Sequence, residues 1–133
     1  MKTKMRVTGL GGIFFRAKNT KKAQAWYQKH FGLPLDPNWG GMSFHWRDEK
    51  NPKKKGSTVW SAFDPETKYF GSAKQAFMIN YRVANLKQVL AALKKERVWI
   101  DPKGIEASEF GKFAWIKDGD GNRIELWQPP KGM

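Results

Sequence analysis

An internal duplication narrows the folds open to this chain. The segment IFFRAKNTKKAQAWYQK, which starts at Ile13, aligns with INYRVANLKQVLAALKK, which starts at Ile79. Ile, Arg, Asn, Lys, Ala and Lys recur in register within it. A repeat of this size indicates that one supersecondary unit occurs twice. We therefore expect two similar modules within a single domain, since 133 residues is a length typical of one domain.

The hydrophobic pattern predicts the same order of elements, β-α-β-β-β, in both halves. The first module spans about residues 7–63, with strands at 7–17, 33–35, 42–47 and 58–63 and a helix at 21–30 that Asn19 or Thr20 caps. Residues 64–75 show no sustained period and are interpreted as a linker. The second module spans about residues 76–130, with strands at 77–83, 98–100, 113–117 and 123–128 and a helix at 86–96 that Asn85 caps.

The last two strands form a predicted hairpin with a carboxylate on its second strand. The turn at 118–122, DGDGN, contains residues that bond their own backbone or tolerate positive φ. Alternation then places Glu125 and Trp127 on one face, with Ile124 and Leu126 on the other. A single carboxylate among bulky apolar neighbours either points into a pocket or lies on a solvated face, and this stretch alone does not decide between the two.

Composition excludes several classes of function. The chain has no cysteine, which removes disulfides, thiolate nucleophiles and sulfur-ligated metals. It has no apolar run long enough to span a membrane and no signal-peptide core, so we expect a cytoplasmic protein. The net charge of +13 raises the question of nucleic-acid binding, but lysine outnumbers arginine by about three to one and is spread along the chain. We interpret the charge as a solvated basic surface and do not expect a nucleic-acid partner.

The doubled βαβββ pattern that ends in GKFAWIKDGDGNRIELWQP resembles the vicinal oxygen chelate superfamily. This group includes glyoxalase I, bleomycin-resistance proteins and extradiol dioxygenases. The resemblance covers nearly the whole chain and implies that the two modules curl into an incomplete barrel around a cavity. It also implies a homodimer, because a second subunit often completes or borders this cavity.

In metal-dependent members of that superfamily, four equivalent strand positions supply the ligands, and Glu125 matches the last of them. The other three matching positions hold Gly12, Met78 and Trp60, none of which offers a ligand for a hard divalent cation. We therefore expect no cofactor. The alternative is an atypical divalent-metal site that includes Glu125, which His45 could in principle join.

Strand parity predicts an aromatic-walled pocket with a few polar groups, a composition typical of small-molecule sites. We expect Phe14, Trp60 and Trp127 to stack against a planar or apolar ligand, and Arg16, Arg82 or Asn80 to orient a carboxylate or carbonyl. His45 is a further candidate pocket residue. In such surroundings Glu125 would either pair with an arginine or have a raised pKa.

Two functions follow from this pocket. The first is a metal-independent protein, similar to glyoxalases and bleomycin-resistance proteins, that binds a small aromatic or acidic molecule. The second is a lyase, isomerase or dioxygenase-type enzyme in which Glu125 is a base or a ligand of the atypical metal. Bulky residues that simply fill the barrel are the alternative to both. Binding of nucleic acid by charge alone would instead show steeply salt-dependent retention on DNA.

Overall fold

The computed structural model describes residues 3–133 and contains seven strands and two helices within them. Along the chain the elements are β1 (Val7–Arg16), α1 (Thr20–Phe31), β2 (Met42–Arg47), β3 (Lys55–Phe63), β4 (Phe77–Val83), α2 (Leu86–Lys95), β5 (Glu106–Ser108), β6 (Gly111–Lys117) and β7 (Arg123–Gln128).

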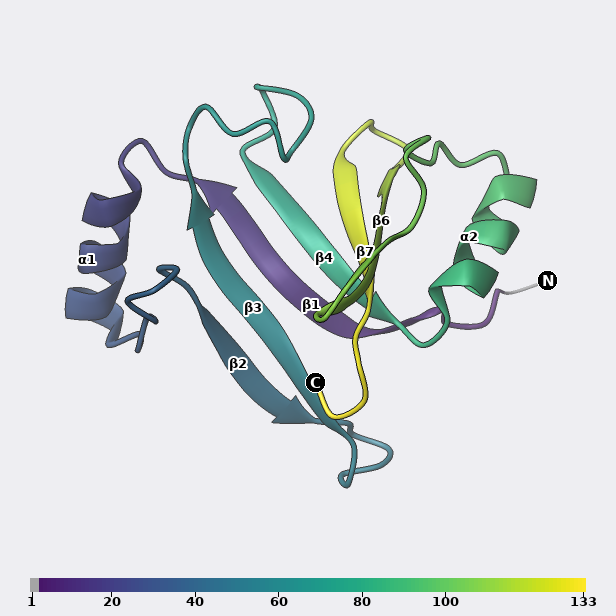
Figure 1. The fold of residues 1–133 in the computed structure, drawn as a ribbon, viewed down its shortest axis with the longest axis horizontal. Coiled ribbons are helices and arrows are strands. Elements are labelled where there is room, and N and C mark those ends of the chain that lie inside the picture. The colour runs from purple at the N-terminus through teal and green to yellow at the C-terminus, as the bar shows by residue number, and fades with distance from the viewer. Residues whose placement is uncertain (1–2) are drawn as a thin grey trace.

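All seven strands belong to one mixed sheet with the order β2-β3-β1-β4-β7-β6-β5. β1 runs parallel to β3 and antiparallel to β4, and β4 runs parallel to β7. The sheet curves strongly, with α1 outside β3 and α2 outside β6 and β7 (Figure 1). It ends at β2 and β5, so it is not closed into a barrel.

The two halves of the chain meet where β1 pairs with β4. Gly12 lies opposite Asn80, and Phe14 lies opposite Met78. In the repeat alignment Gly12 corresponds to Met78 and Phe14 corresponds to Asn80, so the pairing relates the two halves symmetrically. The predicted α+β fold, with two repeated modules curved into an incomplete barrel, is confirmed.

Two predicted strands are missing or reduced. Residues 33–35 form no strand, because Pro34 has no N–H group to donate to a ladder and Leu33 still bonds to the carbonyl of Tyr27 at the end of α1. Of residues 98–100, only Ile100 pairs, through an isolated bridge to Ile116. The short strand β5, which the sequence left unassigned, pairs instead with the start of β6.

Asparagine side chains fix the starts of both helices. Asn19 accepts a hydrogen bond from the Lys22 N–H at 3.0 Å, and Asn85 accepts one from the Gln88 N–H at the same distance. Gly32 ends α1 with a φ of 66°, a conformation that glycine adopts without strain. No helix of the described chain is long and apolar enough to cross a membrane.

Many of the buried apolar residues form two clusters, one on each side of the sheet. Beneath α2 lie Val83, Leu86, Ala114, Ile116 and Leu126. The second cluster contains Phe14, Phe70, Met78 and Trp115, and Phe70 comes from the segment between the modules. This second cluster supports the base of the cavity described next.

Candidate functional site

A cavity of about 710 Å³ lies within the curve of the sheet. Both halves of the chain contribute to its wall, together with the segment that joins them. Its lining consists of Gly11, Phe14, Trp39, Ser43, His45, Ser57, Val59, Phe63, Tyr69, Asn80, Phe110, Phe113, Glu125, Trp127 and Met133. Most of these side chains are apolar or aromatic, and Glu125 is the one acidic residue among them.

Glu125 is the polar centre of this cavity, and its side chain is 2% exposed. Its Oε1 accepts a hydrogen bond from Asn80 Nδ2 at 2.6 Å. Its Oε2 accepts one from Trp115 Nε1 at 3.0 Å and another from the Tyr69 hydroxyl. The donors come from β4, from β6 and from the segment between the modules, so three separate parts of the chain fix the carboxyl group.

Burial and hydrogen bonding act in opposite directions on this carboxyl group. Burial raises the pKa of Glu125, while the hydrogen bonds from Tyr69, Asn80 and Trp115 lower it by a smaller amount. Burial, together with the nearby carboxylate, also raises the pKa of Tyr69, so the phenol stays a donor at neutral pH. No arginine of residues 3–133 forms an ion pair with Glu125, and Arg123 pairs with Asp101 instead, so the burial that raises the pKa of Glu125 is not offset by such a pair.

Gly11 makes room for the Asn80 side chain. A Cβ atom at position 11 would lie 2.1 Å from Asn80 Oδ1 and 2.9 Å from the ring of Trp127. The Asn80 Oδ1 atom is buried and has no hydrogen-bond partner in the described chain. Glycine at this position therefore lets Asn80 turn its amide nitrogen toward Glu125.

Four of the predicted pocket residues line the cavity, in addition to Glu125. Phe14 comes from β1, His45 from β2, Asn80 from β4 and Trp127 from β7. The Trp127 indole stacks on Phe113 with ring centroids 6.0 Å apart and planes 6° apart. Its Nε1 donates to the Phe110 carbonyl at 2.7 Å, which fixes the orientation of the ring.

Trp60 does not line the cavity, which corrects the predicted strand parity. Its ring packs against Phe15 and Tyr27, at 5.3 and 4.9 Å between centroids, on the side of the sheet that α1 covers. The parallel pairings show the reason, because Glu125 lies beside Asn80 whereas Ser61 lies beside Phe14. Ser61, one residue after Trp60, is therefore the counterpart of Glu125 in the first module.

Arg16 is also absent from the cavity wall. Its guanidinium and Nε groups donate to four main-chain carbonyls, those of Pro65, Thr67, Ser72 and Gln75, at 2.8 to 2.9 Å. The same guanidinium lies over the Phe70 ring, 5.1 Å from its centroid. Arg16 thus shapes the connection that carries Tyr69, and it is not placed to orient a carboxylate in the cavity.

Arg82 is buried at one end of the cavity rather than in its wall. Its guanidinium lies between two indole rings, 5.3 Å from the centroid of Trp46 and 5.0 Å from that of Trp127. It donates to the main-chain oxygens of Ser57 at 3.2 Å and Met133 at 2.9 Å. Its donors are therefore directed at the protein itself.

Sequence reasoning missed the two donors to Glu125 Oε2. Tyr69 lies in residues 64–75, which were interpreted as a linker because they lack periodicity. Trp115 was predicted to lie on a strand, but nothing singled out its N–H group. The available indication was an aromatic pair, Tyr69 and Phe70, within an otherwise polar connection, since solvated linkers seldom need two large rings.

The residues of the cavity do not fit a divalent metal. Of the four positions that match the superfamily's metal ligands, Gly12 and Met78 offer no hard ligand. The strand register shows that the third position is Ser61 and not Trp60. Both oxygens of Glu125 already accept hydrogen bonds from the protein. Residues 3–133 contain no group of three or more His, Cys, Asp or Glu side chains placed to hold a metal ion.

Comparison of the sequence with protein-family models and with curated proteins finds no match. Solved structures do resemble the fold. Methylmalonyl-CoA epimerase from Mycobacterium tuberculosis superposes with a TM-score of 0.61 at 18% identity, covering 98% of this chain and 93% of that one. A variant of the Streptomyces coelicolor enzyme, in complex with 2-nitronate-propionyl-CoA, gives 0.68 at 12% identity, covering 92% and 95%.

A chain of the NAD-dependent benzaldehyde dehydrogenase from Legionella pneumophila also superposes, with a TM-score of 0.57 at 11% identity, covering 90% of this chain and 98% of that one. Sequence identities of 18%, 11% and 12% indicate a shared fold and do not indicate a shared function. The comparisons establish that this chain has a vicinal oxygen chelate-like fold, as its sequence predicts.

Proposed function

We propose that this chain is a binding protein that holds a small aromatic or acidic molecule in its cavity without a metal ion. The observation that carries the proposal is a cavity of about 710 Å³ whose wall is largely aromatic and whose one carboxyl group is already hydrogen-bonded by the protein. Such a wall favours a ligand that buries rings, and the few polar groups select its orientation.

The ring pair of Phe113 and Trp127 supports an aromatic ligand in particular. Aromatic pairs contribute roughly 0.5–1.5 kcal/mol beyond the area that they bury, and Phe14 and Val59 offer further apolar surface in the same wall. Metal independence is supported by the donor set, because residues 3–133 place no group of three or more His, Cys, Asp or Glu side chains to hold an ion, and both Glu125 oxygens already accept hydrogen bonds.

Isothermal titration calorimetry with a panel of aromatic carboxylates, such as benzoate, salicylate and naphthoate, tests this proposal. We expect one molecule to bind per chain, with a negative heat-capacity change from burial of the ring. Ser43→Phe, which adds bulk inside the cavity, should abolish binding. Phe44→Trp is the matched control, because this neighbour on β2 lies outside the cavity and is 45% exposed. Absence of binding by the whole panel, or equal binding by both variants, would reject the proposal.

One observation favours the enzymatic alternative, in which Glu125 transfers a proton. A carboxyl group with a raised pKa inside an apolar cavity has the properties of a general acid or base. The alternative predicts exchange of a carbon-bound hydrogen of a bound carbonyl compound with deuterated water, followed by NMR. The exchange should disappear in Glu125→Gln while ligand affinity is retained. Binding without exchange supports the metal-free binding protein.

A homodimer forms part of the proposal, and an uncovered apolar strip on the sheet supports it. Ile13 on β1 and Phe77 and Ile79 on β4 are 39%, 61% and 38% exposed, while the helices pack mainly on β3, β6 and β7. An exposed strip of this kind is typical of an interface between subunits. Phe77→Lys should shift the protein from dimer to monomer in sedimentation equilibrium, and a parent protein that sediments as a monomer would contradict the proposal.

A further inference from the structure

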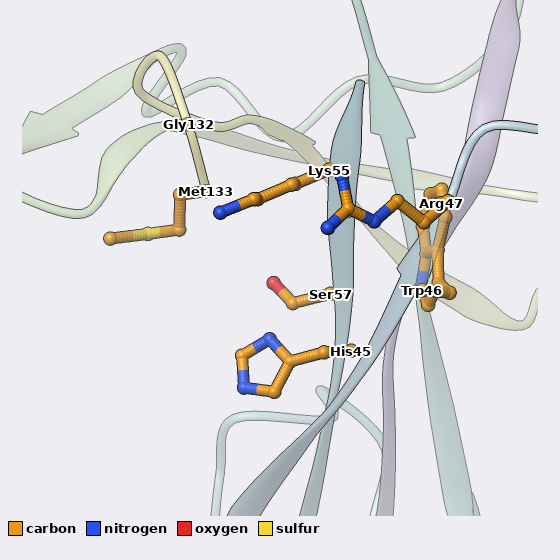
Figure 2. A pocket seen from close by; sticks show the side chains of 8 residues that line it. His45, Trp46, Arg47, Lys55, Ser57, Gly132 and Met133 are labelled. Atoms are coloured by element: carbon orange, nitrogen blue, oxygen red, sulfur yellow. The ribbon is translucent and has the colours of Figure 1, made fainter. Parts of the chain in front are cut away.

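A second hollow, of about 480 Å³, adjoins the aromatic cavity. The two spaces share His45, Ser57 and Met133 in their walls. Figure 2 shows His45, Ser57 and Lys55 extending from β2 and β3 into this hollow, which Met133 borders on its opposite side. We call this hollow the annex, because it continues from the aromatic cavity along β2 and β3.

The register of β2 and β3 orders the residues along this route. Ser43 lies opposite Val59, His45 opposite Ser57, and Arg47 opposite Lys55. Alternate residues of a strand share one face, so these three pairs form a continuous row. The first pair lines the aromatic cavity, the second lines both spaces, and the third lines the annex alone.

The last pair places two positively charged side chains opposite each other on neighbouring strands. Arg47 and Lys55 are cross-strand partners, and Figure 2 shows the Arg47 guanidinium ending beside the Lys55 side chain. Like charges in this position destabilise a sheet. Within residues 3–133 neither side chain forms an ion pair, and Arg47 donates one hydrogen bond, to the Pro52 carbonyl at 3.2 Å. A bound anion would remove the repulsion and use the remaining donors.

We propose that the annex binds an anionic oxygen group, a phosphate or a carboxylate, at the end of the same molecule whose apolar body occupies the aromatic cavity. The inference rests on the proposed function and specifies its ligand. From the Ser43–Val59 pair to the Arg47–Lys55 pair is four residues along the strand, or about 13 Å. The ligand is thus an amphipathic molecule with its ring and its anion separated by roughly that length.

Matched probes test this spacing directly. Phenyldecyl phosphate, the corresponding carboxylate and the corresponding alcohol are compared by calorimetry with their phenylpropyl analogues, whose chains are too short to reach the annex. We expect the long phosphate or carboxylate to bind about tenfold more tightly than the long alcohol, because charged hydrogen bonds are added. The short anions should bind no more tightly than the short alcohol. Whichever long anion gains more identifies the terminal group.

Two double variants that each remove two positive charges distinguish a local contact with the anion from the effect of the protein's net charge. Arg47→Gln/Lys55→Gln should remove the tenfold gain and leave the affinity for the long alcohol unchanged. Lys94→Gln/Lys95→Gln, at the end of α2, changes the net charge equally and should preserve the gain. Circular dichroism confirms that each variant is folded.

The proposal is overturned if the long anions bind no more tightly than the alcohol, if the short anions gain equally, or if the α2 variant loses the gain as well. In each of these cases binding of the alcohol itself still supports the aromatic cavity as a ligand site. Failure of every probe to bind, the alcohols included, rejects the proposed function together with the annex.

Discussion

Replacing Glu125 by glutamine or by leucine measures how the cavity stabilises its carboxyl group. Glutamine keeps an oxygen that can accept from Trp115 and Tyr69, and its amide can donate to Asn80 Oδ1, which has no partner in the described parent chain, once the Asn80 amide turns over. Leucine has nearly the same shape but accepts nothing. The two variants therefore separate the loss of charge from the loss of hydrogen bonds.

The magnitudes follow from the donors that each variant leaves unpaired. A buried donor without an acceptor costs about 1–3 kcal/mol. Glu125→Leu removes the acceptor of three donors, of which the Trp115 and Asn80 groups are the buried ones, so we expect it to lower the free energy of unfolding by about 2–6 kcal/mol. Glu125→Gln leaves only the turned Asn80 amide nitrogen unpaired, in the buried place where Oδ1 has no partner in the described parent chain, so we expect it to cost less than Glu125→Leu.

The pH dependence provides the second part of this test. Because burial raises the pKa of Glu125 above its ordinary value of 4.5, the folded protein binds this proton more tightly than the unfolded chain does. The resulting stabilisation is fully present below the unfolded pKa and is lost as the pH rises through the folded one. Relative to Glu125→Gln, the parent should lose stability over that window with a slope of at most about 1.4 kcal/mol per pH unit.

Urea unfolding followed by tryptophan fluorescence, repeated from acidic to neutral pH, provides the measurement for the parent and both variants. A stability difference between parent and Glu125→Gln that does not change with pH would show that the carboxyl group has no raised pKa. Equal destabilisation by glutamine and leucine would show that the amide cannot replace the carboxyl group in this network. Either result would refute the reasoning.

Three further predictions follow from other contacts. Elemental analysis should find divalent metal near zero in both the parent and Glu125→Gln; stoichiometric metal that disappears in the variant would refute this. Gly11→Ala should displace Asn80 and lower the free energy of unfolding by about 1–3 kcal/mol, and an unchanged value would contradict the close approach. Arg16→Ala should lower it by about 2 kcal/mol or more and speed proteolytic cleavage within residues 65–75, whereas unchanged cleavage would show that the carbonyl contacts do not hold this segment.

The sequence predicted the features that depend on local chemistry. The helix starts at Asn19 and Asn85 were predictable because a cap needs residues only a few positions away. The turn before β7 was predictable for the same reason, and Asp118 indeed accepts hydrogen bonds from the N–H groups of Asp120 and Asn122. The duplication then predicted that the two halves of the chain fold into similar modules.

Features that depend on register or on long-range contact were not predictable in this way. Trp60 was placed on the wrong face because an alignment error of one residue reverses every side chain of a strand. Arg16 shares the expected face of β1, but its long side chain reaches carbonyls about fifty residues away. Tyr69 lies fifty-six positions from Glu125, and nothing in an aperiodic segment indicates such a partner.

The position of Tyr69 in the segment between the modules has a consequence for a protein cut in that segment. Tyr69 lies before the second module and Glu125 near its end, so a cut between residues 71 and 75 would put the phenol and the carboxyl group on separate fragments. β1 in the first fragment and β4 in the second would still present complementary edges to each other. Burial of Glu125 needs both fragments, so the return of its raised pKa would report that the two pieces have reassembled.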